Sequence, residues 1–117
     1  MAINIKRVYD PYDANDGKRI LIDRLWPRGL TKERAHIDLW LKDIAPSTEL
    51  RQWFSHDPAK WNEFQKRYHT ELKANKAAVN RLKDELGQGR VTLVYGAKDE
   101  VHNDAAVLKD LLDKNNL

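Results

Sequence analysis

The sequence contains no cysteine. This absence excludes disulfide bonds, thiolate zinc sites and a cysteine nucleophile. No apolar run approaches the roughly 20 residues that a membrane-spanning helix needs, so we expect no membrane partner. The first residues, Met-Ala-Ile-Asn-Ile-Lys, lack the apolar core of a signal peptide, and we therefore expect a cytoplasmic protein.

Several familiar ligand-binding motifs are also missing. The sequence has no G-x-x-x-x-G-K-[ST] and no G-x-G-x-x-G, so it contains neither a P-loop nor a dinucleotide fingerprint. The four histidines lack the spacing of metal ligands, and we predict no metal site. No repeat or linker is visible, and 117 residues suit one α/β domain over residues 1–117. The sequence indicates no particular cofactor or oligomeric state.

Positive charge is modest and unevenly placed. The formal net charge is +3, and the whole surplus lies in residues 58–86, because acidic and basic residues balance elsewhere. A dedicated DNA-binding domain usually concentrates more positive charge than this. Nucleic acid is therefore an alternative partner that charge supports only weakly.

Hydrophobic periodicity predicts an α/β fold. Strand character alternates with helical character along the chain, which favours a mostly parallel sheet flanked by helices, as in a Rossmann-like sandwich. The predicted strands are residues 3–9, 20–22, 37–41 and 91–95. The third of these also fits a helix, but Pro46 must end the element soon afterwards, and we therefore prefer the strand.

Capping residues mark the predicted helices. Thr31 and Ser47 are suitable N-caps for two short helices, and Asp57-Pro58 is a strong start for a third. A continuous helix over residues 58–86 would be about 43 Å long. A domain of this size has a radius of gyration of about 13 Å, so we expect a break near Asn75.

Polar side chains concentrate just after two of the predicted strands. In parallel sheets, ligands bind beyond the carboxyl ends of the strands. The segment 23–29 places Asp23, Arg24, Trp26 and Arg28 there. Two guanidiniums can grip a phosphate or carboxylate, and the indole can form a pocket wall. The structural alternative is that Asp23 pairs with an arginine and Trp26 only covers the core.

The second such segment joins the strand 91–95 to the last helix. Gly96 would allow the backbone to approach a ligand closely, and the first amides of the helix could receive an anion. His102 can act as a general acid or base near neutral pH, and Lys98 and Asp99 are candidate ligand-binding residues. Each could equally be a surface or capping residue.

Several segments resemble the YeaO-like proteins, which belong to a larger bacterial grouping known only as a domain of unknown function. The match extends in order over nearly the whole chain. The matching segments are Arg7-Val8-Tyr9-Asp10, Ile22-Asp23-Arg24-Leu25-Trp26-Pro27-Arg28-Gly29, Ala45-Pro46-Ser47, Leu50-Arg51, Trp53-Phe54 and Val91-Thr92-Leu93-Val94-Tyr95.

The resemblance implies a Rossmann-like α/β fold in a small cytoplasmic protein. Distant members carry an aspartate-variable-arginine pattern after an early strand, and Asp23 matches it here with Arg24 or Arg28. They also carry a cysteine-histidine-arginine motif at the start of the last helix. Only His102 matches that motif, because Val101 stands in place of the cysteine and Asn103 in place of the arginine. This departure removes thiol chemistry and puts a shared reaction in doubt.

Some relatives are called transcriptional regulators, but no helix-turn-helix signature is visible here.

The leading hypothesis is a small enzyme or binding protein for an anionic, phosphate-bearing small molecule. Arg24 and Arg28 would anchor the anion, Trp26 would form a wall, and Asp23 and His102 would be the catalytic residues that move protons. A nucleic-acid-associated module or regulator, and a purely structural or partner-binding domain, are the alternatives.

Overall fold

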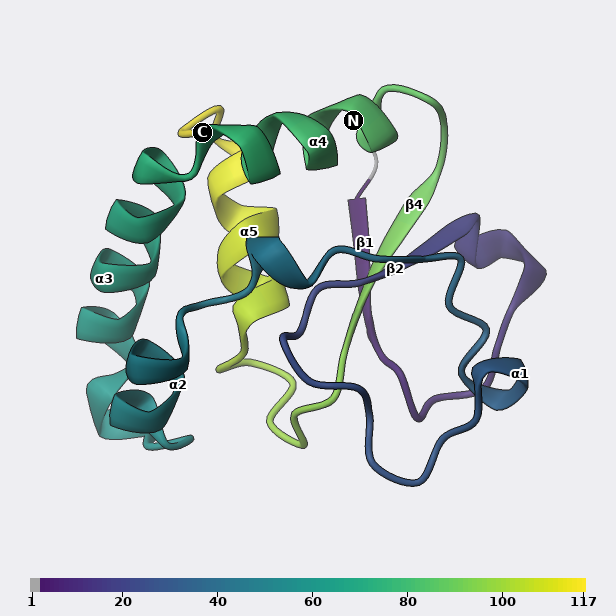
Figure 1. Cartoon of the computed structure of the whole chain (residues 1–117), viewed down its shortest axis with the longest axis horizontal. Coiled ribbons are helices and arrows are strands. Elements are labelled where there is room, and N and C mark those ends of the chain that lie inside the picture. The colour runs from purple at the N-terminus through teal and green to yellow at the C-terminus, as the bar shows by residue number, and fades with distance from the viewer. Residues whose placement is uncertain (1–2) are drawn as a thin grey trace.

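A parallel sheet lies at the centre of the computed structural model, which describes residues 3–117 (Figure 1). Within these residues the sheet has four strands in the order β1-β4-β2-β3. The strands are β1 (Ile3–Arg7), β2 (Lys18–Leu21), β3 (Leu39–Trp40) and β4 (Val91–Tyr95). Every pairing is parallel, so the predicted α/β class with a parallel sheet is confirmed.

β4 is the most buried strand, and it pairs with β1 along its whole length and with β2 over four residues. All five of its residues are buried, as a continuous run of β-branched and aromatic residues predicts. Its alternate residues point to opposite faces of the sheet. Val91, Leu93 and Tyr95 join the large hydrophobic core, whereas Val94 belongs to a smaller cluster on the other face.

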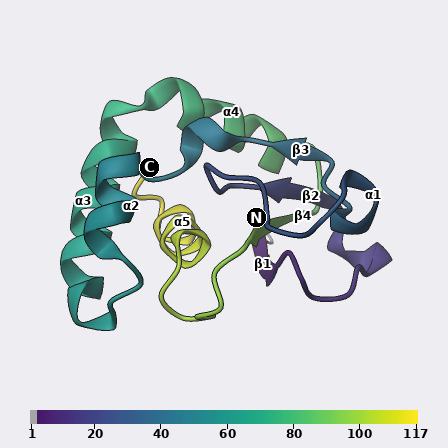
Figure 2. The ribbon, with the colours of Figure 1, turned by 60° about the horizontal axis from the view of Figure 1, so that its bottom comes forward.

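Helices cover one face of the sheet. They are α2 (Thr48–Phe54), α3 (Trp61–Ala74), α4 (Lys76–Leu86) and α5 (Asp104–Asp113). In both views of the ribbon, α5 lies between the sheet and α3, and α2 packs beside α3 (Figures 1 and 2). None of the helices in residues 3–117 combines the length and apolar character that crossing a bilayer requires.

The predicted caps and the predicted helix break are confirmed. The Thr31 hydroxyl accepts a hydrogen bond from Arg34 N at the start of α1 (Lys32–Ala35), and the Ser47 hydroxyl accepts one from Leu50 N in α2. Asn75, with φ −112° and ψ 58°, separates α3 from α4. The segment after Asp57 begins as a short 3-10 turn, Pro58–Lys60, before α3.

The second face of the sheet is covered mostly by loop. Trp26, Leu30, Ile37 and Trp40 pack there against the cluster that contains Val94. Trp40 belongs to β3, and the other three come from the segment between β2 and β3, whose only helix is the single turn of α1. The segment that carries the predicted arginines is therefore anchored to the sheet by its apolar residues.

A buried ion pair lies at the opposite end of the sheet from the candidate site. The Arg19 side chain is 1% exposed, and its Nη1 lies 2.7 Å from Asp16 Oδ2. Burial alone would raise the pKa of Asp16, but hydrogen bonds from Arg19 and Lys6 lower it. The adjacent Gly17 has φ +67°, and a side chain there would collide with the carbonyl of Arg90.

Asp16→Asn is expected to reduce the free energy of unfolding by about 2–3 kcal/mol, because it leaves the Arg19 guanidinium without a counter-charge. Urea denaturation at pH 7 measures the change. Asp84→Asn is the control, since Asp84 is exposed and forms no ion pair within residues 3–117. Equal stability of the two variants would contradict the assignment of this pair.

Candidate functional site

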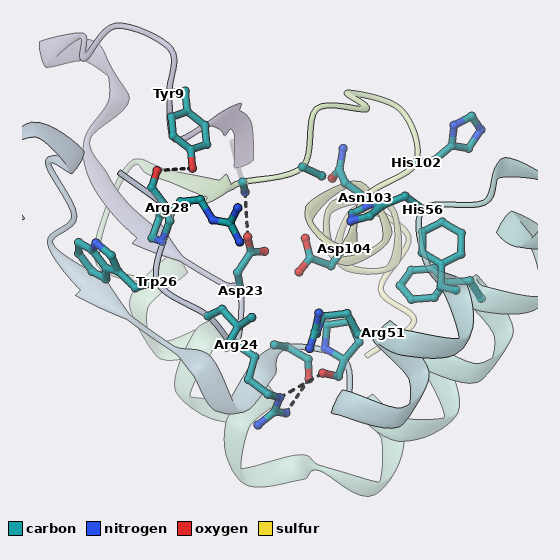
Figure 3. Close-up of a pocket in the computed structure, with 18 residues that line it drawn as sticks. Tyr9, Asp23, Arg24, Trp26, Arg28, Arg51, His56, His102, Asn103 and Asp104 are labelled. Carbon is teal, nitrogen blue, oxygen red and sulfur yellow. Dashed lines mark hydrogen bonds between the residues drawn. The ribbon is translucent and has the colours of Figure 1, made fainter. Parts of the chain in front are cut away.

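A pocket of about 460 Å³ lies beyond the carboxyl ends of β1, β2 and β4 (Figure 3). Its walls come from the loops that follow these strands, from α2 and from the start of α5. Aromatic side chains of α2 and α3 form part of the wall opposite the β2 loop. The predicted site residues that line it are Asp23, Arg24, Trp26, Arg28 and His102.

Asp23 connects two of the loops around this pocket. It follows β2, and its Oδ2 accepts a hydrogen bond from Gly96 N, after β4, at 2.8 Å. A Cβ at Gly96 would lie 3.3 Å from that oxygen, so glycine allows the close approach. The sequence predicts that Gly96 lets the backbone approach a ligand closely, and in the structure the group that it approaches is the Asp23 carboxylate. The Asp23 carbonyl also accepts a 2.7 Å hydrogen bond from Trp40 Nε1.

Asp104, the first residue of α5, faces Asp23 across the pocket. Figure 3 shows their carboxyl groups pointing toward one another. Burial raises the pKa of Asp104 well above its ordinary value, and repulsion by Asp23 together with the hydrogen bond between the two groups raises it further. The raised pKa favours the protonated form of Asp104, which can donate a hydrogen bond to Asp23. The two facing groups form a carboxyl–carboxylate pair.

Sequence reasoning did not identify Asp104. An acidic residue in the first turn of a helix normally complements the helix dipole, so its presence at that position carries no functional signal. Its partner Asp23 is distant in the sequence, and only the fold brings the two together. The one available signal was its position directly after the candidate segment that ends at Asn103.

The three arginines of the pocket have different environments. Arg24 donates from Nε to the Pro46 carbonyl at 3.3 Å and from Nη2 to the Ala45 carbonyl at 3.4 Å, as the dashed lines in Figure 3 show. By contrast, the side chains of Arg28 and Arg51 form no hydrogen bond or ion pair with residues 3–117. Two guanidiniums are therefore available to a ligand.

Arg28 and Arg51 are brought to the pocket by different elements. The Tyr9 hydroxyl, after β1, donates a 2.9 Å hydrogen bond to the Arg28 carbonyl and holds that loop in place. Arg51 lies in α2, which the Ser47 cap starts. Sequence reasoning did not select Arg51, because a basic residue on an exposed helical face is ordinary.

Trp26 combines the two roles that the sequence left open. Its Nε1 donates to the Leu30 carbonyl at 2.7 Å, and its ring contacts Trp40 edge-on at 5.4 Å. It covers the smaller core cluster and also lines the pocket.

His102 lies at the rim of the pocket. Its Nδ1 is 2.8 Å from Asp99 Oδ2, and its ring contacts Trp61 edge-on. In Figure 3 the ring points away from Asp23 and Asp104. The structure therefore does not bring the imidazole of His102 to the carboxylate of Asp23, although both residues line one pocket.

Lys98 and Asp99 do not line the pocket. Asp99 accepts hydrogen bonds from the backbone amides of Val101 and His102, both at 2.9 Å. Hydrogen bonds from the backbone and ring of His102 lower the pKa of Asp99 to about 2. Asp99 thus orders the turn before α5.

Two of the first backbone amides of α5, which the sequence suggests as an anion site, are occupied by side chains of the chain itself. The Asn103 side chain accepts from Ala106 N at 2.8 Å, and Asp104 Oδ1 accepts from Ala105 N at 2.9 Å. These side chains satisfy the amides that would otherwise bind a ligand. Within residues 3–117, no three side chains of the metal-binding types gather at one point.

Much of the positive charge in residues 58–86 is engaged in contacts. Lys60 and Arg67 lie over the ring of Trp53, and Arg81 pairs with Glu85. Lys18 also contacts Glu85, at 2.5 Å. The contacts tie these cations to neighbouring side chains.

An unusual backbone conformation brings His56 to the pocket. Ser55 and His56 have φ values of 48° and 56°, so two consecutive non-glycine residues are left-handed. This conformation costs about 1–2 kcal/mol for each such residue. The reversal after α2 places His56 in the pocket lining.

Residues 2–116 match the family described as the inactive DUF488-N3 subclade. The chain belongs to this family. Among its relatives, the uncharacterized protein YeaO of Escherichia coli K12 is 45% identical over 112 residues, covering 96% of this chain and 97% of YeaO. An uncharacterized protein of Mycobacterium tuberculosis H37Rv is 40% identical over 111 residues, covering 95% of this chain and 93% of that protein. These matches confirm the resemblance to YeaO-like proteins within the DUF488-N3 grouping. No solved structure matches the chain.

Ser55→Gly is expected to increase the free energy of unfolding by about 1 kcal/mol, because glycine adopts the left-handed conformation without steric strain. Gln52→Gly, in the exposed interior of α2, is the matched control and should decrease it by about 1 kcal/mol. Chemical denaturation of both variants checks the opposite signs. A loss of stability in Ser55→Gly would show that Ser55 is not strained.

Asp104→Asn is expected to change how stability depends on pH. In the unfolded chain Asp104 ionises near its ordinary pKa of 3.8, whereas in the folded protein it holds its proton to higher pH. The folded state therefore binds more protons in this window, and wild-type stability falls as pH rises, by at most about 1.4 kcal/mol per pH unit. Asparagine keeps a donor toward Asp23 but does not titrate.

Unfolding free energies measured in urea from pH 4 to pH 8 check this prediction. The advantage of Asp104→Asn over wild type should grow with pH. The control is Asp43→Asn, because Asp43 is exposed and its side chain has no hydrogen bond within residues 3–117. Parallel profiles for wild type and Asp104→Asn would show that Asp104 ionises normally.

Proposed function

We propose that this protein is a receptor for a small molecule that carries a phosphate monoester. Arg28 and Arg51 hold the phosphate in the pocket beyond β2 and β4. The observation that carries the proposal is that both guanidiniums line a pocket without a partner among residues 3–117. A guanidinium binds phosphate oxygens through two parallel hydrogen bonds, which gives the site selectivity as well as affinity.

The charge of the pocket supports phosphate over carboxylate. Three arginines, Arg24, Arg28 and Arg51, line the pocket with two aspartates, Asp23 and Asp104, and the raised pKa of Asp104 reduces the negative charge of that pair. The pocket therefore carries a surplus of positive charge. A phosphate monoester carries nearly two negative charges at pH 7, and it complements this surplus better than a single carboxylate does.

The family match supports binding without turnover. The family is described as inactive. In the YeaO-like resemblance, Val101 occupies the place of a cysteine, and Val101 is 65% exposed and offers no nucleophile. The last position of the motif, an arginine in distant members, is Asn103, which is buried and caps α5. The chain thus has the pocket but lacks the cysteine thiol that would be the nucleophile of the motif.

One observation favours an enzyme as the second candidate. The carboxyl–carboxylate pair of Asp23 and Asp104 holds an acid and a base side by side, which is the arrangement that proton transfer requires. In that case Asp23 would act with Asp104, and His102, held by Asp99, would only shape the rim. Incubation of a phosphate monoester with the protein distinguishes the candidates, because a receptor returns it unchanged.

Arg28→Ala is expected to weaken the binding of phenyl phosphate by about tenfold or more, because one charge-assisted bidentate contact is lost. Isothermal titration calorimetry measures the affinity. The matched control is Arg34→Ala, which removes an exposed arginine that does not line the pocket. Benzyl alcohol, which has the ring without the phosphate, should not bind measurably.

Two results would contradict the proposal. One is that wild type fails to bind phenyl phosphate at millimolar concentration. The other is that Arg28→Ala and Arg34→Ala bind it equally well.

A further inference from the structure

We infer that the ligand of this pocket carries hydroxyl groups beside its phosphate, as a sugar phosphate does, and that Asp23 and Asp104 bind those hydroxyls. This inference rests on the proposed function, because it assumes that Arg28 and Arg51 hold the phosphate. It adds the chemical class of the remainder of the ligand.

The carboxylate of Asp23 has unused hydrogen-bonding capacity in the pocket. Its Oδ2 accepts from Gly96 N, whereas its Oδ1 receives no hydrogen bond from any N–H group of residues 3–117. An ionised carboxylate offers about four acceptor positions, and the proton of Asp104 occupies only one. Because Asp23 lines the pocket, a ligand that enters it meets an acceptor without a donor.

The pair of carboxyl groups cannot receive the phosphate itself. Two anions at hydrogen-bond distance repel one another, so the phosphate must lie toward Arg28 and Arg51 and away from Asp23. The part of the ligand that faces the pair must then donate hydrogen bonds. A purely apolar group there would leave a desolvated carboxylate unsatisfied.

The surrounding charges favour hydroxyl donors over an ammonium group. The guanidinium of Arg28 extends toward the same part of the pocket as the Asp23 carboxyl (Figure 3), so a phosphate on Arg28 must bind the side of the guanidinium that faces away from Asp23. Arg24 lines the pocket as well. A second cation beside Asp23 would be repelled by these groups, whereas a neutral hydroxyl would not be.

The walls and the size of the pocket also fit a sugar phosphate. Phe54 and Phe64 stack on one another with ring centroids 4.2 Å apart and form part of the lining. Aromatic rings offer an apolar surface to the C–H face of a sugar ring. The volume of about 460 Å³ is within the usual range for small-molecule sites.

The test compares phosphates that have the same number of carbon atoms and that carry or lack hydroxyl groups. Ribose 5-phosphate and glucose 6-phosphate are titrated against pentyl phosphate and hexyl phosphate by calorimetry. Wild type should bind at least one sugar phosphate about tenfold more tightly than the matching alkyl phosphate. O-phosphoethanolamine supplies an ammonium donor in place of the hydroxyls.

Variants then assign the preference to the carboxyl pair. Asp104→Ala should reduce the preference for the sugar phosphate severalfold, because the affinity for the sugar phosphate falls by a larger factor than the affinity for the alkyl phosphate. Asp104→Asn, which keeps both a donor and an acceptor, should retain most of it. The comparison of ligands on wild type needs no variant, so the inference remains testable if Asp104→Ala does not fold.

The outcomes separate this inference from the proposed function. Equal binding of sugar and alkyl phosphates, with both weakened in Arg28→Ala, would overturn the inference and leave the phosphate receptor standing. Tightest binding of O-phosphoethanolamine would overturn it in the same way. Failure of every phosphate to bind would overturn both. A sugar preference that Asp104→Ala does not alter would overturn the role of the carboxyl pair.

Discussion

The hydrogen bond from the Gly96 amide to the Asp23 carboxylate determines how the rest of the candidate site is arranged. It joins the loop after β2 to the loop after β4, two neighbouring strands whose carboxyl ends are at the same edge of the sheet. Because Asp23 is fixed there, the half-buried Asp104 at the start of α5 faces a second carboxyl group, and burial together with Asp23 raises its pKa. The loop that leaves Asp23 then carries Arg28 into the pocket. One contact thus places an acceptor, a donor and a cation around a common volume.

Local features of the fold could be predicted well from the sequence. β4 extends over the predicted residues 91–95, because an uninterrupted apolar run has few alternatives to a buried strand. The caps at Thr31 and Ser47 follow from side-chain chemistry, and the break at Asn75 follows from the size of the molecule. The strand predicted over residues 37–41 is only Leu39–Trp40, because an edge strand pairs on one side and ends where its partner ends.

The candidate site could be predicted only in part. The rule that ligands bind beyond the carboxyl ends of parallel strands led to Asp23, Arg24, Trp26, Arg28 and His102, and the fold brings all five to one pocket. The rule fails for side chains whose importance depends on a partner. Asp104 is ordinary until Asp23 faces it, and Lys98 and Asp99 follow the right strand but do not reach the pocket. Periodicity and capping describe neighbours in sequence, whereas Asp23 and Asp104 are far apart in the chain and meet only in the fold.

The order of the strands has a consequence for how the chain is made. β4 lies between β1 and β2, and those two strands do not pair with each other. During synthesis, both leave the ribosome long before their shared neighbour exists. Until residues 91–95 emerge, β1 has no partner strand and β2 can pair only with the two residues of β3. The nascent polypeptide must therefore keep apolar strand edges unpaired for most of translation, and the sheet closes in a late, long-range step.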